Sequence, residues 1–479
     1  MTTFFGLCLG PACVSAESGK ARLRGGDFLD SLPVTEPPAD WLEELFELLR
    51  IPSVSADPAH AEDVQRAGEW VCDFIRAAGG EAELRETETH PLAIGELRAS
   101  RDGDSAPTVL VYGHFDVQPP APLEEWQTPP FEPTVRDGWL CARGVADDKG
   151  QLYLLLKAAS LLAAEDALPV NLRFACDGEE ESGGHSIVDF LEADERGADA
   201  CVIFDGHMLR PGVPIFEIAT RGICYFHVRV RTGERDLHSG LFGGAALNAM
   251  HALMQMLGAV LPREGRLPES LRAGIVMPSD EEIASWQELD SGAEVLAAQG
   301  ARPADARAED ELYFRTWTEP SVDVHGIAGG EPHLQKTVTP VVAEANVSIR
   351  LAPGQDEEAI TAEFERLLRE AAPEGAEVEI DCQAKSPAAL VRPDEQAIQL
   401  GLEAFERVIG ARPLLLRVGG SLPVMAALEQ KGIPTILTGF DLPEGNIHSP
   451  NERFRVEHIP LGVETSKELY KSLAGLTIS

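Results

Sequence analysis

The sequence has no Cys-x-x-Cys pair, although it contains eight cysteines. Because these cysteines are spread singly along the chain, they indicate neither a disulfide framework nor a thiolate zinc site, and they favour a reducing, cytoplasmic location. The chain also has no apolar run that approaches the roughly 18 residues needed to span a bilayer. No membrane partner is therefore expected.

Positive charge is scarce. The chain has 40 Lys and Arg against 79 Asp and Glu, which gives a formal net charge of −39. A protein this acidic repels phosphate backbones and anionic membranes at long range, so nucleic acid is not an expected partner. The simplest interpretation of the charge is a solubilising acidic surface, which does not identify a function.

What is present is the composition of a folded protein. Over 479 residues, 44% are hydrophobic and 25% are charged, which predicts two or three globular domains. Residues 1–38 lie outside this pattern, and we expect them to form a disordered leader. The first helix is predicted over residues 41–50, after a capping box formed by Asp40 and Glu43.

Short apolar runs predict the buried parallel strands of an α/β domain. These runs are residues 108–112, 170–175, 200–204 and 434–438. Helical patterns lie between them, as at residues 151–164, and this alternation is typical of a mixed, largely parallel sheet covered by helices. We assign this discontinuous domain to residues 39–214 and 389–479.

The middle of the chain has a different pattern. Apolar and polar residues alternate from Phe226 to Val230 and from Ala343 to Leu351, which predicts half-exposed antiparallel strands. Helices predicted at residues 247–261 and 357–372 complete an α+β unit. We therefore expect an inserted domain over residues 215–388, with long loops between residues 263 and 332.

Side chains that could bind a metal follow each buried strand of the first domain. In chain order they are His114, Asp116, Asp147, Asp148, Glu179, Glu180, Glu181, Asp205 and His448. Open α/β sheets place their sites at the carboxyl ends of the strands, so the coincidence of several such segments predicts one site. Imidazoles and carboxylates without thiolates favour a catalytic zinc site, with Mn²⁺ or Co²⁺ as possible substitutes.

Four motifs together resemble those of the dinuclear zinc aminoacyl hydrolase and peptidase family. This family includes carnosine dipeptidases, bacterial dipeptidases, aminoacylase, acetylornithine deacetylase and succinyl-diaminopimelate desuccinylase. The motifs are GHFDVQP at 113–119, ARGVADDKG at 142–150, EESG at 180–183 and NIHS at 446–449. The resemblance implies that residues 39–214 and 389–479 form the metal-binding catalytic domain and that residues 215–388 form a lid and dimerisation domain.

The resemblance also implies a ligand set for two Zn²⁺ per subunit. In that arrangement His114 and Asp205 hold one ion, Glu181 and His448 hold the other, and Asp147 bridges them. The family further implies a cis peptide bond after the bridging aspartate.

Two further residues receive catalytic roles by the same resemblance. A hydroxide that bridges the metals is the expected nucleophile, and Glu180 is the expected general base because it neighbours a ligand without being one. Asp116 is expected to hydrogen-bond His114 and to fix its tautomer.

The substrate side of the site resembles the dipeptidase branch. Arg350, Thr337, Ser421 and Gly420 match positions that bind the terminal carboxylate of the substrate, and a guanidinium is well suited to grip a carboxylate. His238 matches a lid histidine that reaches the active site of the other subunit, which implies a homodimer. Taken as bare residues, Arg350 could be an exposed strand arginine paired with Glu344 or another surface acid, and His238 could be an ordinary loop residue.

These observations favour a homodimeric, cytoplasmic zinc dipeptidase that acts as an exopeptidase. An N-acyl amino acid amidohydrolase with the same dinuclear site is the alternative within the same chemistry. A metal-binding protein without catalytic activity is the alternative from another class.

Overall fold

In the computed structural model, residues 36–420 and 422–477 are described. They divide into two compact units. Unit 1 contains the described residues up to Ile218, Val391–Leu416 and the residues from Ala427 onward, and unit 2 contains Ala219–Leu390 and Arg417–Ala426. The expected disordered leader lies outside the described residues except for residues 36–38. The catalytic and lid roles of the two units stay predictions.

Unit 1 is built on a six-stranded sheet with the order β1-β2-β6-β3-β7-β17. Its strands are β1 (Glu81–Arg85), β2 (Leu92–Leu97), β3 (Thr108–His114), β6 (Asn171–Asp177), β7 (Ala200–Phe204) and β17 (Thr435–Thr438). The four strands β6, β3, β7 and β17 are parallel, whereas β2 pairs antiparallel with β6 and β1 pairs antiparallel with β2 at one edge. Every residue of β6, β7 and β17 is buried, as expected of parallel strands that are covered on both faces. The predicted mixed, largely parallel sheet is confirmed.

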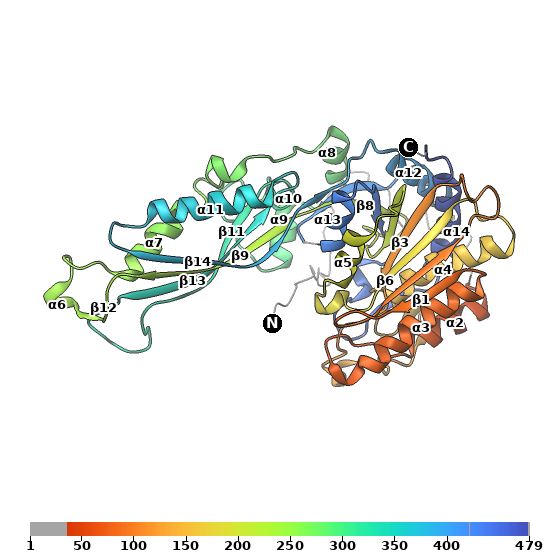
Figure 1. Ribbon diagram of the computed structural model, residues 1–479, viewed down its shortest axis with the longest axis horizontal. Coiled ribbons are helices and arrows are strands. Elements are labelled where there is room, and N and C mark those ends of the chain that lie inside the picture. Colours follow the sequence, from red (N-terminus) through yellow and green to blue (C-terminus); the bar gives the residue numbers. More distant parts are fainter. Residues whose placement is uncertain (1–35, 421, 478–479) are drawn as a thin grey trace. The chain divides into compact units, whose positions relative to one another are not determined.

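Helices cover this sheet. They are α2 (Ala39–Leu49), α3 (Ala61–Ala77), α4 (Lys149–Ala164), α5 (Ser186–Ala193), α12 (Gln396–Ile409) and α14 (His458–Leu473). The helix α3 packs on β1 and β2, α4 packs on β3 and β7, and α5 packs on β6 (Figure 1). The helix α14 packs against α4 and α12. Because α4 begins directly after Asp148, its packing on β3 and β7 brings the acidic loop before it to the sheet.

The predicted capping box at the first helix is wrong. The N-cap of α2 is Pro38, and no side chain caps the helix. The amide groups of Trp41 and Leu42 both donate to the Pro38 carbonyl, so the helical turn starts before Asp40. Asp40 therefore lies within the first turn, where its charge still suits the positive end of the helix dipole.

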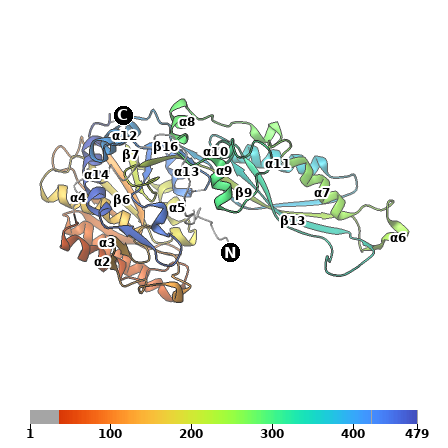
Figure 2. The ribbon, with the colours of Figure 1, turned by 180° about the vertical axis from the view of Figure 1, so that it is seen from behind.

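Unit 2 contains a four-stranded antiparallel sheet with the order β11-β13-β9-β14. Its strands are β9 (Gly222–Arg231), β11 (Ser321–Ala328), β13 (Val342–Leu351) and β14 (Glu377–Ser386), and the helices on it are α7 (Ala249–Val260) and α11 (Glu357–Ala371). Buried and half-buried residues alternate along β9, as the period of the sequence predicts. The rings of Phe226 and Phe364 stack at 4.8 Å between strand and helix, and Figures 1 and 2 show both helices alongside the sheet.

The segment expected to carry long loops contains three short helices, α8 (Asp280–Trp286), α9 (Gly292–Ala298) and α10 (Leu312–Trp317). Capping boxes open α8 at Ser279 and α9 at Ser291. A buried ion pair between Arg417 and Glu282, with Nε and Oε1 2.6 Å apart, anchors α8.

The remaining elements are small. They are β4 (Thr134–Arg136), β5 (Trp139–Cys141), β8 (Ile215–Thr220), β10 (Leu237–His238), β12 (Val338–Thr339), β15 (Ala389–Leu390), β16 (Leu414–Val418), β18 (Arg453–Arg455), α6 (Ser239–Phe242) and α13 (Pro423–Gln430). Within the described ranges, no helix combines the length and the apolar character needed to cross a membrane.

Candidate metal centre

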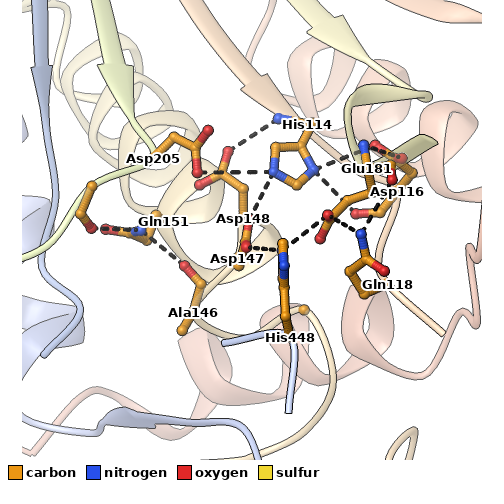
Figure 3. A network of polar contacts seen from close by, with 12 residues as sticks. His114, Asp116, Gln118, Ala146, Asp147, Asp148, Gln151, Glu181, Asp205 and His448 are labelled. Atoms are coloured by element: carbon orange, nitrogen blue, oxygen red, sulfur yellow. Dashed lines mark hydrogen bonds and ion pairs between the residues drawn. The ribbon is translucent and has the colours of Figure 1, made fainter. Parts of the chain in front are cut away.

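The five predicted metal ligands lie at the carboxyl-terminal edge of the parallel sheet of unit 1. His114 is the last residue of β3, and Asp205 directly follows β7. Glu181 lies in the short 3-10 helix Glu180–Ser182 after β6, and His448 lies in the loop after β17. Asp147 comes from the loop that precedes α4. Figure 3 shows that these side chains converge.

The predicted ligands form two groups that share Asp147. One carboxylate oxygen of Asp147, Oδ1, lies 3.0 Å from Nε2 of His114, and the other, Oδ2, lies 2.9 Å from Nε2 of His448. Asp205 completes the first group, with Oδ1 3.9 Å from His114 Nε2, and Glu181 completes the second, with Oε2 3.0 Å from His448 Nε2. In each group the potential ligand atoms all lie within 4.8 Å of one another. Each oxygen of Asp147 therefore faces the histidine of a different group.

The electrostatics of the cluster suit a cation. Burial, and then the Asp147 carboxylate, raise the pKa of Asp205 to about 8, and the same two causes raise the pKa of Glu181. Burial opposes protonation of His448, yet Asp147 and Glu181 outweigh it and raise the pKa of this histidine to about 11. Three carboxylates crowded in a largely buried site repel one another, and divalent cations relieve that repulsion. The donor set of two imidazoles and three carboxylates fits Zn²⁺, Mn²⁺ or Co²⁺.

Asp116 lies behind His114. Nδ1 of His114 lies 3.3 Å from Oδ1 of Asp116 and 3.2 Å from its main-chain oxygen, so the ring is held with Nε2 toward Asp147. Oδ2 of Asp116 accepts hydrogen bonds from the Ser55 hydroxyl at 2.6 Å and from the Glu181 amide at 3.1 Å. This fully buried carboxylate thus contacts a residue of each ligand group.

Glu180 differs from its two acidic neighbours in its contacts. In the part of the chain that the structure describes, no hydrogen bond or ion pair engages its carboxylate. Burial raises the pKa of Glu180; His114 opposes this shift, and Asp205 and Glu181 add to it. Glu180 is therefore a carboxylate beside the ligands that is not committed to a structural contact.

Glu179 and Asp148, which received no catalytic role from the sequence, make structural contacts. Oε1 of Glu179 accepts from the Ser186 amide at 2.9 Å, and Oε2 accepts from the Thr89 hydroxyl and from the His90 amide at 3.3 Å. Burial opposes ionisation of Glu179, but these hydrogen bonds outweigh it and lower its pKa.

The cis peptide expected from the resemblance is present between Asp147 and Asp148. The side chain of Asp148 is fully buried, and its Oδ2 accepts a hydrogen bond from the His114 amide at 3.0 Å.

Three residues around the ligands were not singled out from the sequence. Nε2 of Gln118 donates to Oε2 of the predicted ligand Glu181 at 2.8 Å. Glu452 and Arg143 form a buried ion pair at 2.7 Å, and Glu452 also accepts hydrogen bonds from the loop that carries Asp147. The presence of Gln118 and Arg143 inside the motifs was the one available signal for these two residues.

The predicted carboxylate-binding residues and His238 belong to unit 2. Arg350 is half-buried on β13, and burial lowers its pKa, with Asp323 opposing the shift. His238 pairs with Val338 in the short β10–β12 ladder and is exposed. Its Nδ1 accepts a hydrogen bond from the Gly240 amide at 3.1 Å, so Nε2 is not the atom used in this contact.

The other predicted substrate contacts are less defined. Thr337 is exposed, and its carbonyl accepts hydrogen bonds from the amide and hydroxyl of Ser239. Gly420 is exposed, and its carbonyl accepts from the Arg221 amide at 2.9 Å. Ser421 lies outside the described residues. The substrate-binding roles of all these residues stay predictions.

Comparisons with known proteins identify relatives of this chain. A family model described as Peptidase family M20/M25/M40 matches residues 110–472. The Cys-Gly metallodipeptidase dug1 of Schizosaccharomyces pombe is 29% identical over 466 residues, covering 89% of this chain and 94% of that protein. The Beta-Ala-His dipeptidase of Homo sapiens is 28% identical over 422 residues, covering 85% of this chain and 81% of that protein.

Solved structures show the same fold. Human carnosine dipeptidase 1 superimposes with a TM-score of 0.66 at 25% identity, covering 91% of this chain and 96% of that one. The M20 family metallo-carboxypeptidase Sso-CP2 of Sulfolobus solfataricus gives a TM-score of 0.75 at 24% identity, covering 91% of this chain and all of that one.

Proposed function

Since the chain belongs to peptidase family M20/M25/M40, we propose that it is a metal-dependent exopeptidase that hydrolyses dipeptides at a dinuclear centre. The observation that carries this proposal is the sharing of Asp147 between two three-residue ligand groups, next to the uncommitted carboxylate of Glu180. Relatives named as Cys-Gly and Beta-Ala-His dipeptidases support a dipeptide substrate over an N-acyl amino acid.

His114, Asp147 and Asp205 would hold one ion, and Asp147, Glu181 and His448 the other. Two divalent ions supply Lewis acidity at the scissile carbonyl and lower the pKa of water toward neutrality. Zinc is the proposed metal, and Mn²⁺ and Co²⁺ are substitutes that the same donor set accepts.

The residues of the chain supply proton transfer and orientation. Glu180 acts as the general base, because its carboxylate lies among the ligands without a structural partner, and it delivers the proton to the leaving amine. A raised pKa makes it a better proton carrier near neutral pH. Asp116 keeps the His114 ring in the orientation that aims Nε2 at Asp147.

Recognition of the free carboxylate is the proposed task of Arg350, aided by Thr337, Gly420 and Ser421. A guanidinium can donate two parallel hydrogen bonds to a carboxylate, which selects a substrate with a free C-terminus. Glu344 lies on the same strand as Arg350, and its Oε2 is 3.6 Å from Nε2 of His227 and 3.9 Å from Nε of Arg229.

A homodimer in the cytoplasm is the proposed assembly and location, with His238 contributed to the active site of the partner subunit. Apolar side chains support a subunit contact beside His238. Leu241 is 76% exposed, Phe242 is 46% exposed and Val338 is 39% exposed. Such exposed apolar side chains close together are typical of interaction surfaces.

The test of the activity is a substrate panel on chelator-stripped protein with Zn²⁺ or Mn²⁺ restored separately. We expect cleavage of Cys-Gly or β-Ala-His and no cleavage of the same dipeptides with an amidated C-terminus. Cleavage of N-acetyl or N-succinyl amino acids alone would reject the dipeptidase assignment while leaving a metal hydrolase. Fully metallated protein that cleaves nothing in the panel would reject the enzyme.

The test of the shared site mixes two inactive variants, His238→Ala and Arg350→Ala. Random reassociation makes half of the dimers mixed, and each mixed dimer has one complete site of two, so about a quarter of the wild-type activity should return. Activity that stays at the level of the separate variants would show that His238 does not act across the subunits.

A further inference from the structure

Glu452 is a fully buried carboxylate in which both oxygens are hydrogen-bonded. Its Oε1 accepts from the amides of Ala146 at 2.8 Å and Asp147 at 3.2 Å. Its Oε2 accepts from the Gly144 amide at 2.9 Å and from Nη1 of Arg143 at 2.7 Å. Three main-chain amides and one guanidinium of the 143–147 segment thus converge on a single side chain.

The same carboxylate also belongs to the segment that carries His448. Nη2 of Arg143 donates to the carbonyl of Ser449, the residue next to His448, at 3.3 Å, so the ion pair joins the two segments at two points. The exposed fractions of Arg143 and Glu452 are 1% and 0%, which removes competition from water. The 143–147 segment carries Asp147, which belongs to both predicted ligand groups, and the C-terminal segment carries His448, which belongs to one.

A buried ion pair is not required for stability, because well-packed apolar side chains of similar volume often stabilise a protein as well or better. What an apolar pair could not provide is the set of acceptors for the amides of Gly144, Ala146 and Asp147. These acceptors fix the backbone on which the Asp147 carboxylate is mounted, and that carboxylate must present one oxygen to each ligand group.

We propose that Glu452, paired with Arg143, is a positioning residue that holds Asp147 in its bridging orientation and thereby sets the affinity of both metal subsites. This inference rests on the proposed dinuclear function. It assigns to Glu452 a role through the ligand loop, with no contact of its own to a metal or a substrate.

The test is the substitution Glu452→Gln, which keeps the size but replaces one acceptor oxygen by a donor amide facing N–H groups. Loss of such a supporting contact weakens metal binding by about 10–100-fold. We expect this loss for both ions, measured with Zn²⁺ or Co²⁺ alone by competition against a chelator, with an unchanged far-UV circular dichroism spectrum. Excess metal should restore kcat to near the wild-type value.

Two controls separate positioning from stability. Glu444→Gln changes an exposed glutamate of the same C-terminal loop and should leave metal affinity unchanged. Glu282→Gln disrupts another buried Arg–Glu pair, formed with Arg417 in unit 2, and should lower thermal stability without a change in metal affinity.

A Glu452→Gln protein that behaves like Glu282→Gln, less stable but with wild-type metal affinity, would overturn the proposal. If this variant does not fold, Arg143→Lys decides, since a lysine offers one nitrogen in place of the two guanidinium nitrogens that contact Glu452 and the Ser449 carbonyl. Unchanged metal affinity in a folded Arg143→Lys protein would also overturn the proposal. Wild-type protein that binds two ions but cleaves no dipeptide would overturn the proposed substrate and leave this comparison intact.

Discussion

Glu179 and Glu180 are adjacent in sequence, but the structure predicts opposite consequences for the same substitution. The Glu180 carboxylate has no structural partner among the described residues, so Glu180→Gln should change the stability little. A general base contributes roughly 10²–10⁴-fold to the rate, which corresponds to about 2.7–5.4 kcal/mol of transition-state stabilisation. We therefore expect kcat to fall by that factor while both metals are retained.

Glu179→Gln should show the reverse pattern. Each oxygen of Glu179 accepts from a main-chain amide, and one also accepts from the Thr89 hydroxyl. Replacing an ionised acceptor by an amide here removes about 1.5–3 kcal/mol from the free energy of unfolding. At roughly 2–4 °C per kcal/mol for a domain of this size, the melting temperature should fall by about 3–12 °C. The kcat of the folded protein should change much less than that of Glu180→Gln.

The assay combines dipeptide hydrolysis at saturating metal, metal content of the purified proteins and thermal melting, for both variants. The reasoning is refuted if Glu180→Gln loses metal in proportion to its activity, because Glu180 would then be a ligand. It is equally refuted if Glu180→Gln retains more than a tenth of the wild-type kcat, or if Glu179→Gln loses as much kcat without a change in stability.

Three further predictions concern single residues. Asp147→Asn leaves one acceptor oxygen for two ligand groups, so metal analysis should find at most one tightly bound ion; retention of two would contradict the bridging role. Gly150→Ala would place its Cβ 1.9 Å from the Val145 carbonyl oxygen, so the 144–147 loop must shift, and chelator competition should detect weaker metal binding in a folded protein. Burial lowers the pKa of His458 to about 4, although its hydrogen bond to the Phe440 carbonyl opposes this shift. Below about pH 6.5 the histidine is therefore protonated in the unfolded chain but not in the folded protein, so the free energy of unfolding falls as the pH falls. In denaturant unfolding, the free energy of unfolding should decrease between pH 6.5 and 4 by about 3 kcal/mol less in His458→Gln than in the wild type. Equal decreases in the two proteins would refute this assignment.

Much of unit 1 could be predicted from the sequence because its strands are buried on both faces. The apolar run over residues 200–204 coincides with β7, and the runs in β3, β6 and β17 are correct to within two residues at each end. Side chains that follow such strands must meet at one edge of a parallel sheet, so the sequence alone predicts that His114 and Asp205 lie close together.

Other features leave no such signal. The helices α8, α9 and α10 have six or seven residues each, too few for a helical period to stand out from a loop. The boundary of α2 depends on which carbonyl accepts the first amides, and an acidic residue in the first turn has the same sequence pattern as an acidic cap. Glu452 is one of 79 acidic residues, and its importance depends on amide groups of a loop about 300 residues earlier in the chain.

The late position of His448 and Glu452 in the chain has a consequence for biosynthesis. During translation, β3, the 143–147 loop and β7 leave the ribosome long before these two residues are made. The emerging polypeptide then contains His114, Asp147, Glu181 and Asp205, but neither the imidazole of His448 nor the carboxylate of Glu452 that accepts hydrogen bonds from the 143–147 loop. A chain truncated before residue 448 would accordingly contain Asp147 and Glu181 but would lack the histidine of the second predicted ligand group. The second predicted ligand group, which consists of Asp147, Glu181 and His448, is thus complete only after His448 has been translated.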